Sequence, residues 1–176
     1  MIEILRERRS IRKYSEKSIE PDTIELLKEA ILRSPSSRGI NPWCFVFVDD
    51  KEILRKLSLA KEHGSSFLKD AQLGIVVCGD EKRSDCWIED GSIASIIVQL
   101  QAQYLGLGSC WIQIRNRMHS KEKTAEDYVK EVLNIPPHLR VLSIISIGYP
   151  DEKKRGIKKE ELEYEKIYRN RFGERW

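Results

Sequence analysis

The chain has no strong excess of charge of either sign. It carries 31 Lys and Arg against 28 Asp and Glu, which gives a formal net charge of +3 over 176 residues. A balance this close gives no general reason to expect a nucleic-acid partner. The first residues already include Glu3, Arg6 and Glu7, so no apolar signal segment opens the chain and we expect a cytoplasmic location.

Cysteine and histidine are scarce and widely scattered. Cys44, Cys78, Cys86 and Cys110 show no CxxC or finger-like spacing, and the first two lie inside apolar runs. We therefore expect buried free thiols in preference to disulfides or metal ligands. The three histidines are equally dispersed, so a zinc or iron site is not expected.

Several common catalytic motifs are missing. There is no GxSxG sequence, and no plausible catalytic triad can be assembled. The pair Gly106 and Gly108 follows an expected helix and precedes an expected strand. That order is the reverse of a dinucleotide-binding fingerprint, which excludes a Rossmann interpretation.

Residues 91–114 contain no charged side chain. This uncharged stretch is long enough to raise the question of a membrane span. Gln99, Gln101 and Gln103 argue against one, because three amides are costly in lipid. A helix buried between protein surfaces can pair such groups. We expect a central helix here, and no membrane association.

The remaining pattern predicts one layered α+β domain followed by a charged tail. The expected helices cover 2–9, 21–33 with Ser18 as a candidate cap, 51–63, 91–105 and 120–133. The expected strands cover 44–48, 73–79, 109–114 and 140–148. Residues 1–150 form the domain, whereas 151–176 cannot form a core of their own. The apolar tail residues must therefore pack on this subunit or on a partner; they are Leu162, Tyr164, Ile167, Tyr168, Phe172 and Trp176.

Two segments are candidate ligand sites. Arg8, Arg9 and Arg12 surround Ser10, and guanidinium groups beside a hydroxyl suit a phosphate. An exposed basic helix end is the alternative interpretation. The loop 35–43 offers small polar groups and a glycine that permits close backbone approach, or it is an ordinary linker.

The order of four motifs is more specific than any one of them. RRSIRKY, SPSSRGINPW, LGLGSCWI and VLSIISIGYP follow one another along the chain. Together they resemble the nitroreductase family of flavin enzymes, over about residues 8–150. The resemblance implies an α+β fold with a central mixed or antiparallel sheet flanked by helices. It also implies an intertwined homodimer with FMN at the subunit interface, so that 1–150 is an FMN-binding domain.

The resemblance also assigns cofactor-binding positions. The opening motif implies that the flavin phosphate and pyrimidine side are held by Arg8, Arg9, Ser10 and Arg12. The loop motif implies ring contacts from Pro35, Ser36 and Ser37, and less safely from Gly39 and Asn41, where the family often has other residues. Backbone groups of Trp111, Ile112 and Gln113 are expected beside flavin N5. Lys154 or Arg155 could reach the phosphate, although a solvated face fits this charged segment equally well.

The implied activity is hydride transfer from NAD(P)H, through tightly bound FMN, to a nitroaromatic, quinone or similar small oxidant. The flavin carries the electrons, so no protein nucleophile is required. Three alternatives stay open at this stage. They are another flavin chemistry on the same fold such as dehalogenation, a non-catalytic flavin carrier or sensor, and a nucleic-acid binder that uses the basic N-terminal segment.

Overall fold

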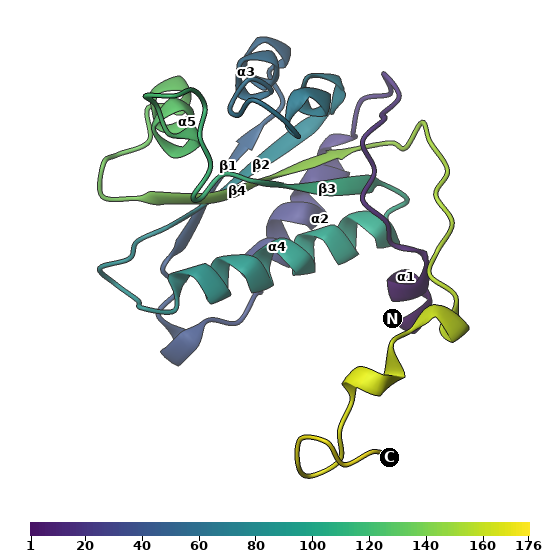
Figure 1. Ribbon diagram of the computed structural model, residues 1–176. Coiled ribbons are helices and arrows are strands. Elements are labelled where there is room, and N and C mark those ends of the chain that lie inside the picture. The colour runs from purple at the N-terminus through teal and green to yellow at the C-terminus, as the bar shows by residue number, and fades with distance from the viewer.

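A computed structural model describes residues 1–176 and contains one four-stranded antiparallel sheet. The strand order is β1-β2-β4-β3, with β1 at Trp43–Val48, β2 at Leu73–Gly79, β4 at Arg140–Gly148 and β3 at Gly108–Gln113. The α-helices are α1 (Ile2–Glu7), α2 (Pro21–Leu32), α3 (Lys51–Leu57), α4 (Trp87–Tyr104) and α5 (Ala125–Leu133). Helices α2 and α4 cover one face of the sheet, and α3 and α5 cover the other (Figure 1). The predicted α+β domain with an antiparallel sheet is confirmed.

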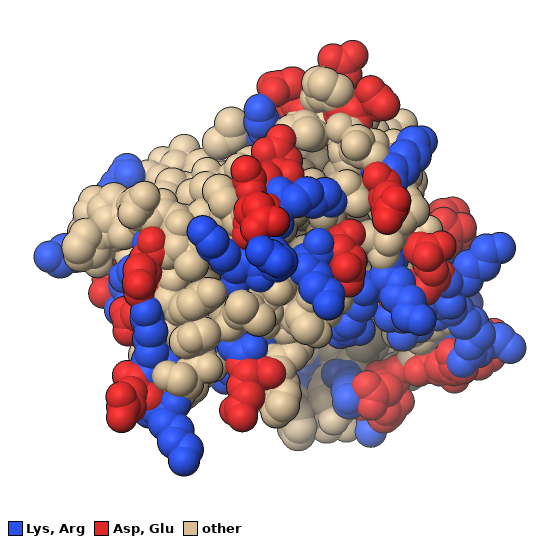
Figure 2. Space-filling view, turned by 90° about the horizontal axis from the view of Figure 1, so that it is seen from above, with Lys and Arg blue, Asp and Glu red and all other residues tan.

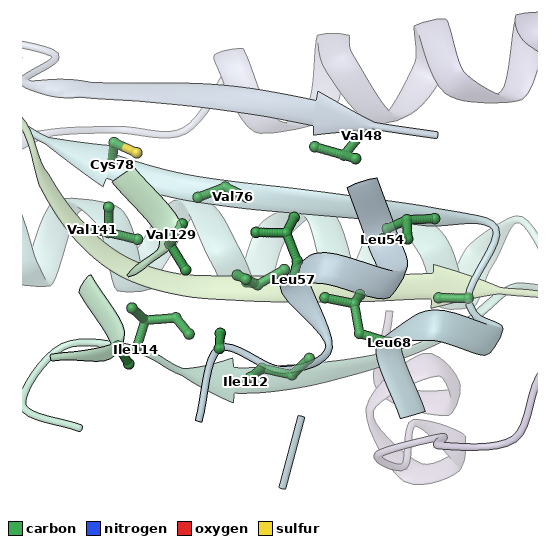
Figure 3. Packing of buried hydrophobic residues seen from close by; sticks show 14 of the residues in the cluster. Val48, Leu54, Leu57, Leu68, Val76, Cys78, Ile112, Ile114, Val129 and Val141 are labelled. Atoms are coloured by element: carbon green, nitrogen blue, oxygen red, sulfur yellow. The ribbon is translucent and has the colours of Figure 1, made fainter. Parts of the chain in front are cut away.

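The two central strands are buried on both faces. Every residue of β2 is buried, and in β4 only Arg140 is partly exposed. On the α3 and α5 face, Leu54, Leu57 and Val129 pack on the sheet (Figure 3). Each buried leucine contributes about 1.5–3 kcal/mol. This burial explains why both strands read as continuous apolar runs in the sequence.

Helix α4 begins four residues before the predicted start at residue 91. Its first turn contains Glu89 and Asp90, and negative charge is favourable at a helix N-terminus. The uncharged stretch therefore marks the part of the helix beyond its first turn. No helix of the structure combines the length and the apolar character that crossing a bilayer would require.

Other predicted helix ends were wrong. Helix α3 ends at Leu57, because the chain turns at Ser58, whose carbonyl oxygen accepts a 2.8 Å hydrogen bond from the Ser65 hydroxyl. Helix α5 starts only after Thr124, whose Oγ1 accepts from the Asp127 backbone N–H at 3.0 Å. Ser18 is not the cap of α2. That helix starts with Pro21, which has no backbone N–H and therefore needs no hydrogen-bond acceptor at that position.

The four cysteines are free, as predicted. Cys78 and Cys110 are buried, whereas Cys44 and Cys86 are only partly so. Expected burial is thus confirmed for two of the four. Cys44 faces Cys78 directly across the β1–β2 pair.

The tail after β4 extends away from the domain (Figure 1). Phe172 is 90% exposed and Trp176 is 83% exposed, and Leu162, Tyr164 and Ile167 are about half exposed. Tyr168 instead stacks on Phe172, within the tail itself. These apolar side chains therefore do not find a core on their own subunit.

Candidate functional site

The N-terminal segment that follows α1 is fixed along the edge of β3 and the end of β4. The Ile11 N–H donates to the Ser109 carbonyl at 2.9 Å, and the Ser15 N–H donates to the Tyr149 carbonyl at 2.9 Å. Gly108 permits this approach, since a Cβ there would lie 2.8 Å from Ile11. The sequence RRSIRKY thus leaves the helix at Arg8 and runs as an extended strand-like segment over the domain.

Arg8, Arg9 and Arg12 all lack an acidic partner, but only the side chains of Arg8 and Arg12 make no hydrogen bond within the chain. Arg6 pairs with Glu3, and Arg9 donates to the Arg155 carbonyl. Arg8 is half-buried and makes no ion pair, and the Arg12 guanidinium lies 5.7 Å from the centre of the Phe67 ring. Two unpaired guanidinium groups on one short segment are suited to an anionic ligand.

Glu152 orders the same segment from the other side. Its Oε1 accepts from the backbone N–H groups of Arg12, at 2.5 Å, and Lys13, at 3.2 Å. The Arg12 N–H, together with Lys154, lowers the pKa of this carboxyl despite some desolvation. Glu152 Oε1 also lies 3.1 Å from the Lys154 ammonium, so its charge is shared between the backbone and Lys154, and the Arg12 side chain has no acidic partner. No local sequence pattern points to Glu152 or Phe67, because both contact the segment through tertiary packing.

The structure separates the two predicted basic residues after β4. The Lys154 ammonium donates to the Ser10 carbonyl at 2.6 Å, and its side chain is only 28% exposed. Arg155 instead pairs with Glu161 at 2.6 Å and is mostly exposed. Lys154 thus lies beside the arginine segment, and Arg155 faces solvent.

Strand β3 is an edge strand with backbone groups available on its outer side. The Ile114 N–H bonds to the Leu142 carbonyl of β4 at 3.2 Å, and Ile112 follows the same alternation. Trp111 and Gln113 therefore direct their N–H and C=O groups away from β4. The Trp111 indole N–H donates to the Gln113 side chain at 2.9 Å, which fixes both side chains.

A buried hydroxyl network lies beneath this region. The Tyr14 hydroxyl donates to the Ile11 carbonyl at 2.6 Å and lies 2.7 Å from Ser146 Oγ, which in turn donates to the Cys110 carbonyl at 3.2 Å. Burial raises the pKa of Tyr14, and burial likewise raises the pKa of the Cys110 thiol. Both groups stay protonated at neutral pH. Their role is to hold the segment and β3 together.

The loop 35–41 is closed by its own side chains. Ser36 Oγ lies 2.6 Å from Asn41 Oδ1 and accepts from the Asn41 N–H at 2.9 Å. Arg38, Gly39 and Asn41 all have positive φ, at 54°, 64° and 50°. Glycine suits that conformation at position 39. Ser36 and Asn41 thus bind one another, while Pro35 is exposed and Ser37 is partly buried.

The loop and the arginine segment lie at opposite ends of α4 (Figure 1). The Ser37 N–H donates to Asp90 at the start of α4, whereas Ile11 contacts Gly108 just beyond its end. Eighteen helical residues span about 27 Å. One chain therefore brings Arg8, Ser10, Arg12, Lys154 and β3 together, and it leaves Pro35–Asn41 too far away to touch the same small ligand.

Surface charge agrees with a localised site. On the face seen in Figure 2, Lys and Arg gather across the middle and the right-hand side, with Asp and Glu among them. On this face, positive charge is therefore interrupted by negative charge, whereas a general polyanion binder presents a continuous basic surface. The fold is that of a small α+β protein, and the unpaired guanidinium groups of Arg8 and Arg12 lie together on one segment of it.

Comparison with known proteins identifies the family. Residues 5–62 and 59–149 match the Nitroreductase family. A protein of Archaeoglobus fulgidus provisionally named as an NADH dehydrogenase/NAD(P)H nitroreductase is 38% identical over 151 residues, which cover 84% of this chain and 83% of that protein. A solved structure of an FMN-dependent nitroreductase from Clostridium difficile is 47% identical, with a TM-score of 0.96 over 98% of this chain and 100% of that one. The chain belongs to the nitroreductase family.

Proposed function

We propose that this chain is an FMN-dependent oxidoreductase that takes hydride from NAD(P)H and delivers it to a small oxidant such as a nitroaromatic or quinone. The observation that carries the proposal is the pair of unpaired guanidinium groups, Arg8 and Arg12, fixed beside Ser10 and Lys154. Family membership supports the flavin, since a relative at 47% identity is an FMN-dependent nitroreductase.

The residues present fit the cofactor. Arg8, Ser10 and Lys154 would hold its phosphate, because they combine two cations with a hydroxyl. Bound FMN supplies the electron carrier between the two substrates. Arg12 would stabilise negative charge at the pyrimidine edge, since it has no acidic partner to neutralise it. The outward N–H groups of Trp111 and Gln113 offer donors that do not depend on side-chain identity.

The proposal includes a homodimer. Pro35, Ser36 and Ser37 lie about the length of α4 away from Arg12, so a second copy would supply them to each site. Helix α4 also exposes an apolar surface through Ile93, Ile96 and Tyr104. A symmetric pairing of two copies would cover this surface and complete both sites.

The test is the visible spectrum of the purified protein, before and after anaerobic addition of NADH and NADPH. A flavin spectrum that bleaches on addition would support both cofactor and activity. Arg8→Ala and Arg12→Ala should each weaken FMN binding about tenfold or more, because each removes a charge-assisted contact. Arg55→Ala is the matched control, since Arg55 is an exposed arginine already paired with Glu52.

Protein that stays colourless and does not bind added FMN would contradict the proposal. Bound FMN that neither nucleotide reduces would leave a flavin carrier and exclude the oxidoreductase. If FMN affinity fell equally in Arg12→Ala and Arg55→Ala, the role assigned to Arg12 would be wrong.

A further inference from the structure

Asp90 is a buried carboxylate without a basic partner. Its residue is 2% exposed, and it forms no ion pair. The other buried acid, Glu126, bonds to both Arg140 and Lys130. Burying a carboxylate without a basic partner is costly, so the contacts that Asp90 makes call for an explanation. The positive end of α4 offsets part of this cost, because Asp90 lies in its first turn.

The carboxylate of Asp90 binds the loop that carries the predicted flavin contacts. Its Oδ1 accepts from the Ser37 backbone N–H at 2.8 Å. The loop needs such an anchor, since Arg38 and Asn41 both adopt left-handed backbone conformations. That conformation is sterically unfavourable for Arg38, and less so for Asn41, because asparagine adopts it more readily. The Ser36–Asn41 bonds close the loop on itself, whereas Asp90 fixes it to a long helix.

Three polar atoms of Asp90 and of the residues that flank the loop are buried without a hydrogen-bond partner. They are Asp90 Oδ2, Ser34 Oγ and Trp43 Nε1. Ser34 directly precedes the loop 35–41, and Trp43 lies two residues after its end. Most buried polar atoms in proteins are hydrogen-bonded, so Asp90 and both flanks of the loop depart from the usual pattern.

We infer that Asp90 is a positioning residue for the flavin site, which acts by holding the Ser37 backbone and thereby the Pro35–Ser37 edge that each subunit presents to its partner's flavin. This inference rests on the proposed function. It assigns Asp90 no contact with the flavin itself. The controlling contact is one hydrogen bond, from the Ser37 N–H to Asp90 Oδ1.

Paired variants isolate that hydrogen bond. Asp90→Ala removes the acceptor, whereas Asp90→Asn keeps an oxygen that can accept from Ser37. We expect FMN affinity to fall about tenfold or more in Asp90→Ala and to be largely retained in Asp90→Asn. Ser95→Ala is the matched control, because it removes another buried hydrogen bond of α4, to the Gly91 carbonyl, away from the loop.

The donor side gives a second test that leaves Asp90 intact. Ser37→Pro removes the N–H, and Ser37→Ala keeps it while removing the same hydroxyl. The loss of FMN affinity should be about tenfold greater in Ser37→Pro than in Ser37→Ala. Ser36 before it is already extended, with φ −138° and ψ 157°, so a proline fits at position 37. If Asp90→Ala does not fold, the two Ser37 variants test the inference on their own.

Amide hydrogen exchange provides a readout that needs no flavin. The Ser37 amide should be protected in the wild type and in Asp90→Asn, and it should exchange faster in Asp90→Ala. Unchanged exchange, or FMN affinity equal in Asp90→Ala and the wild type, would overturn the inference and leave the proposed function standing. Equal losses of FMN affinity in Asp90→Ala and Ser95→Ala would also overturn the inference. A wild type that binds no FMN would instead reject the proposed function itself.

Discussion

Acidic neighbours decide which basic side chains of this protein are free to bind a ligand. Arg6 is paired with Glu3, Arg155 with Glu161 and Lys154 with Glu152. Glu152 also accepts from the backbone N–H of Arg12, whose guanidinium has no acidic partner. Exposed pairs such as Arg6–Glu3 contribute little to stability, typically about 0–1 kcal/mol. Their larger effect is on ligand binding, since a basic side chain that is paired with an acid is less able to bind an anionic ligand.

Glu126 shows the opposite use of a carboxylate, as a structural group. It accepts from Arg140 Nε at 2.7 Å and from the Val141 N–H at 3.1 Å, and it lies 3.2 Å from Lys130. Burial acts to raise the pKa of Glu126, but the bonds from Arg140, Val141 and Lys130 outweigh it and lower the pKa below its ordinary value of 4.5. Glu126 thus joins α5 to β4.

Glu126→Gln should destabilise the fold by about 1–3 kcal/mol at pH 7, because it removes the charge that compensates the largely buried Lys130 and weakens the bond from Arg140, which stays paired with Glu81. A depressed pKa contributes stability that is present above the unfolded-state pKa and is lost as pH falls through the folded-state pKa. The difference between variant and wild type should therefore shrink below about pH 4.5. Urea unfolding between pH 3.5 and 7 measures this difference.

Glu131→Gln on the same helix is the control. Glu131 is mostly exposed and pairs with Lys123, so its loss should change stability by less than about 1 kcal/mol. A Glu126→Gln penalty that persists undiminished at pH 3.5 would contradict the assigned ionisation.

At the scale of elements, the sequence pattern predicted the buried strands better than the helix ends. The bounds of β2 and β4 agree with the prediction, because a strand buried on both faces is an uninterrupted apolar run between polar residues. A helix end depends on single hydrogen bonds, such as the one that the Asp127 N–H donates to Thr124 Oγ1. Neighbouring residues can often form similar bonds, so the sequence alone does not define the end. The helix predicted from residue 120 therefore starts only at Ala125.

The candidate site was predictable in its parts but not in its arrangement. The motifs around Arg8, Pro35 and Trp111 were found as short sequences, since each carries distinctive residue types. The tertiary packing places Arg8 beside the strand of Trp111 and Pro35 about the length of α4 away, and no local pattern contains this arrangement. Asp90 was missed for the same reason, because a single acid at the start of an apolar helix is an ordinary feature of sequences.

Gly108→Ala should detach the arginine segment from β3. The new Cβ would lie 2.8 Å from Ile11, so the segment must shift and weaken the bond from the Ile11 N–H to Ser109. FMN affinity should fall about tenfold or more, because Arg8 and Arg12 flank this contact. Titration of FMN fluorescence measures the affinity, and circular dichroism confirms that the fold is kept.

The double variant Gly108→Ala with Ile11→Ala tests the cause. Shortening Ile11 removes two of the three crowding atoms, Cγ1 and Cγ2, and should restore part of the affinity. An affinity loss that is the same with and without Ile11→Ala would show that the contact between segment and strand is not responsible.

The whole molecule carries an exposed apolar tail that its own domain does not cover. In the proposed dimer, the tail would pack on the second copy, because Ile157, Leu162, Tyr164 and Ile167 bring apolar surface that one subunit leaves in water. Contiguous apolar surface of this kind is typical of association sites in soluble proteins.

Removal of residues 157–176 should weaken the dimer about tenfold or more, through loss of buried apolar area. Light scattering over a dilution series measures the monomer–dimer equilibrium of the full and shortened chains. Glu160→Gln is the control, since it changes tail charge without removing apolar surface. A shortened chain as dimeric as the full one would exclude the tail from the interface, and a monomeric full chain would reject the dimer.

The placement of Ser37 and Arg12 at opposite ends of α4 links cofactor loading to assembly. If each pocket is a joint product of two chains, then every flavin bound favours the paired state, and every pairing event raises flavin affinity by the same factor. Dilution would then release the cofactor and dissociate the dimer together. A shortage of flavin in the cell would likewise shift this protein toward inactive single chains.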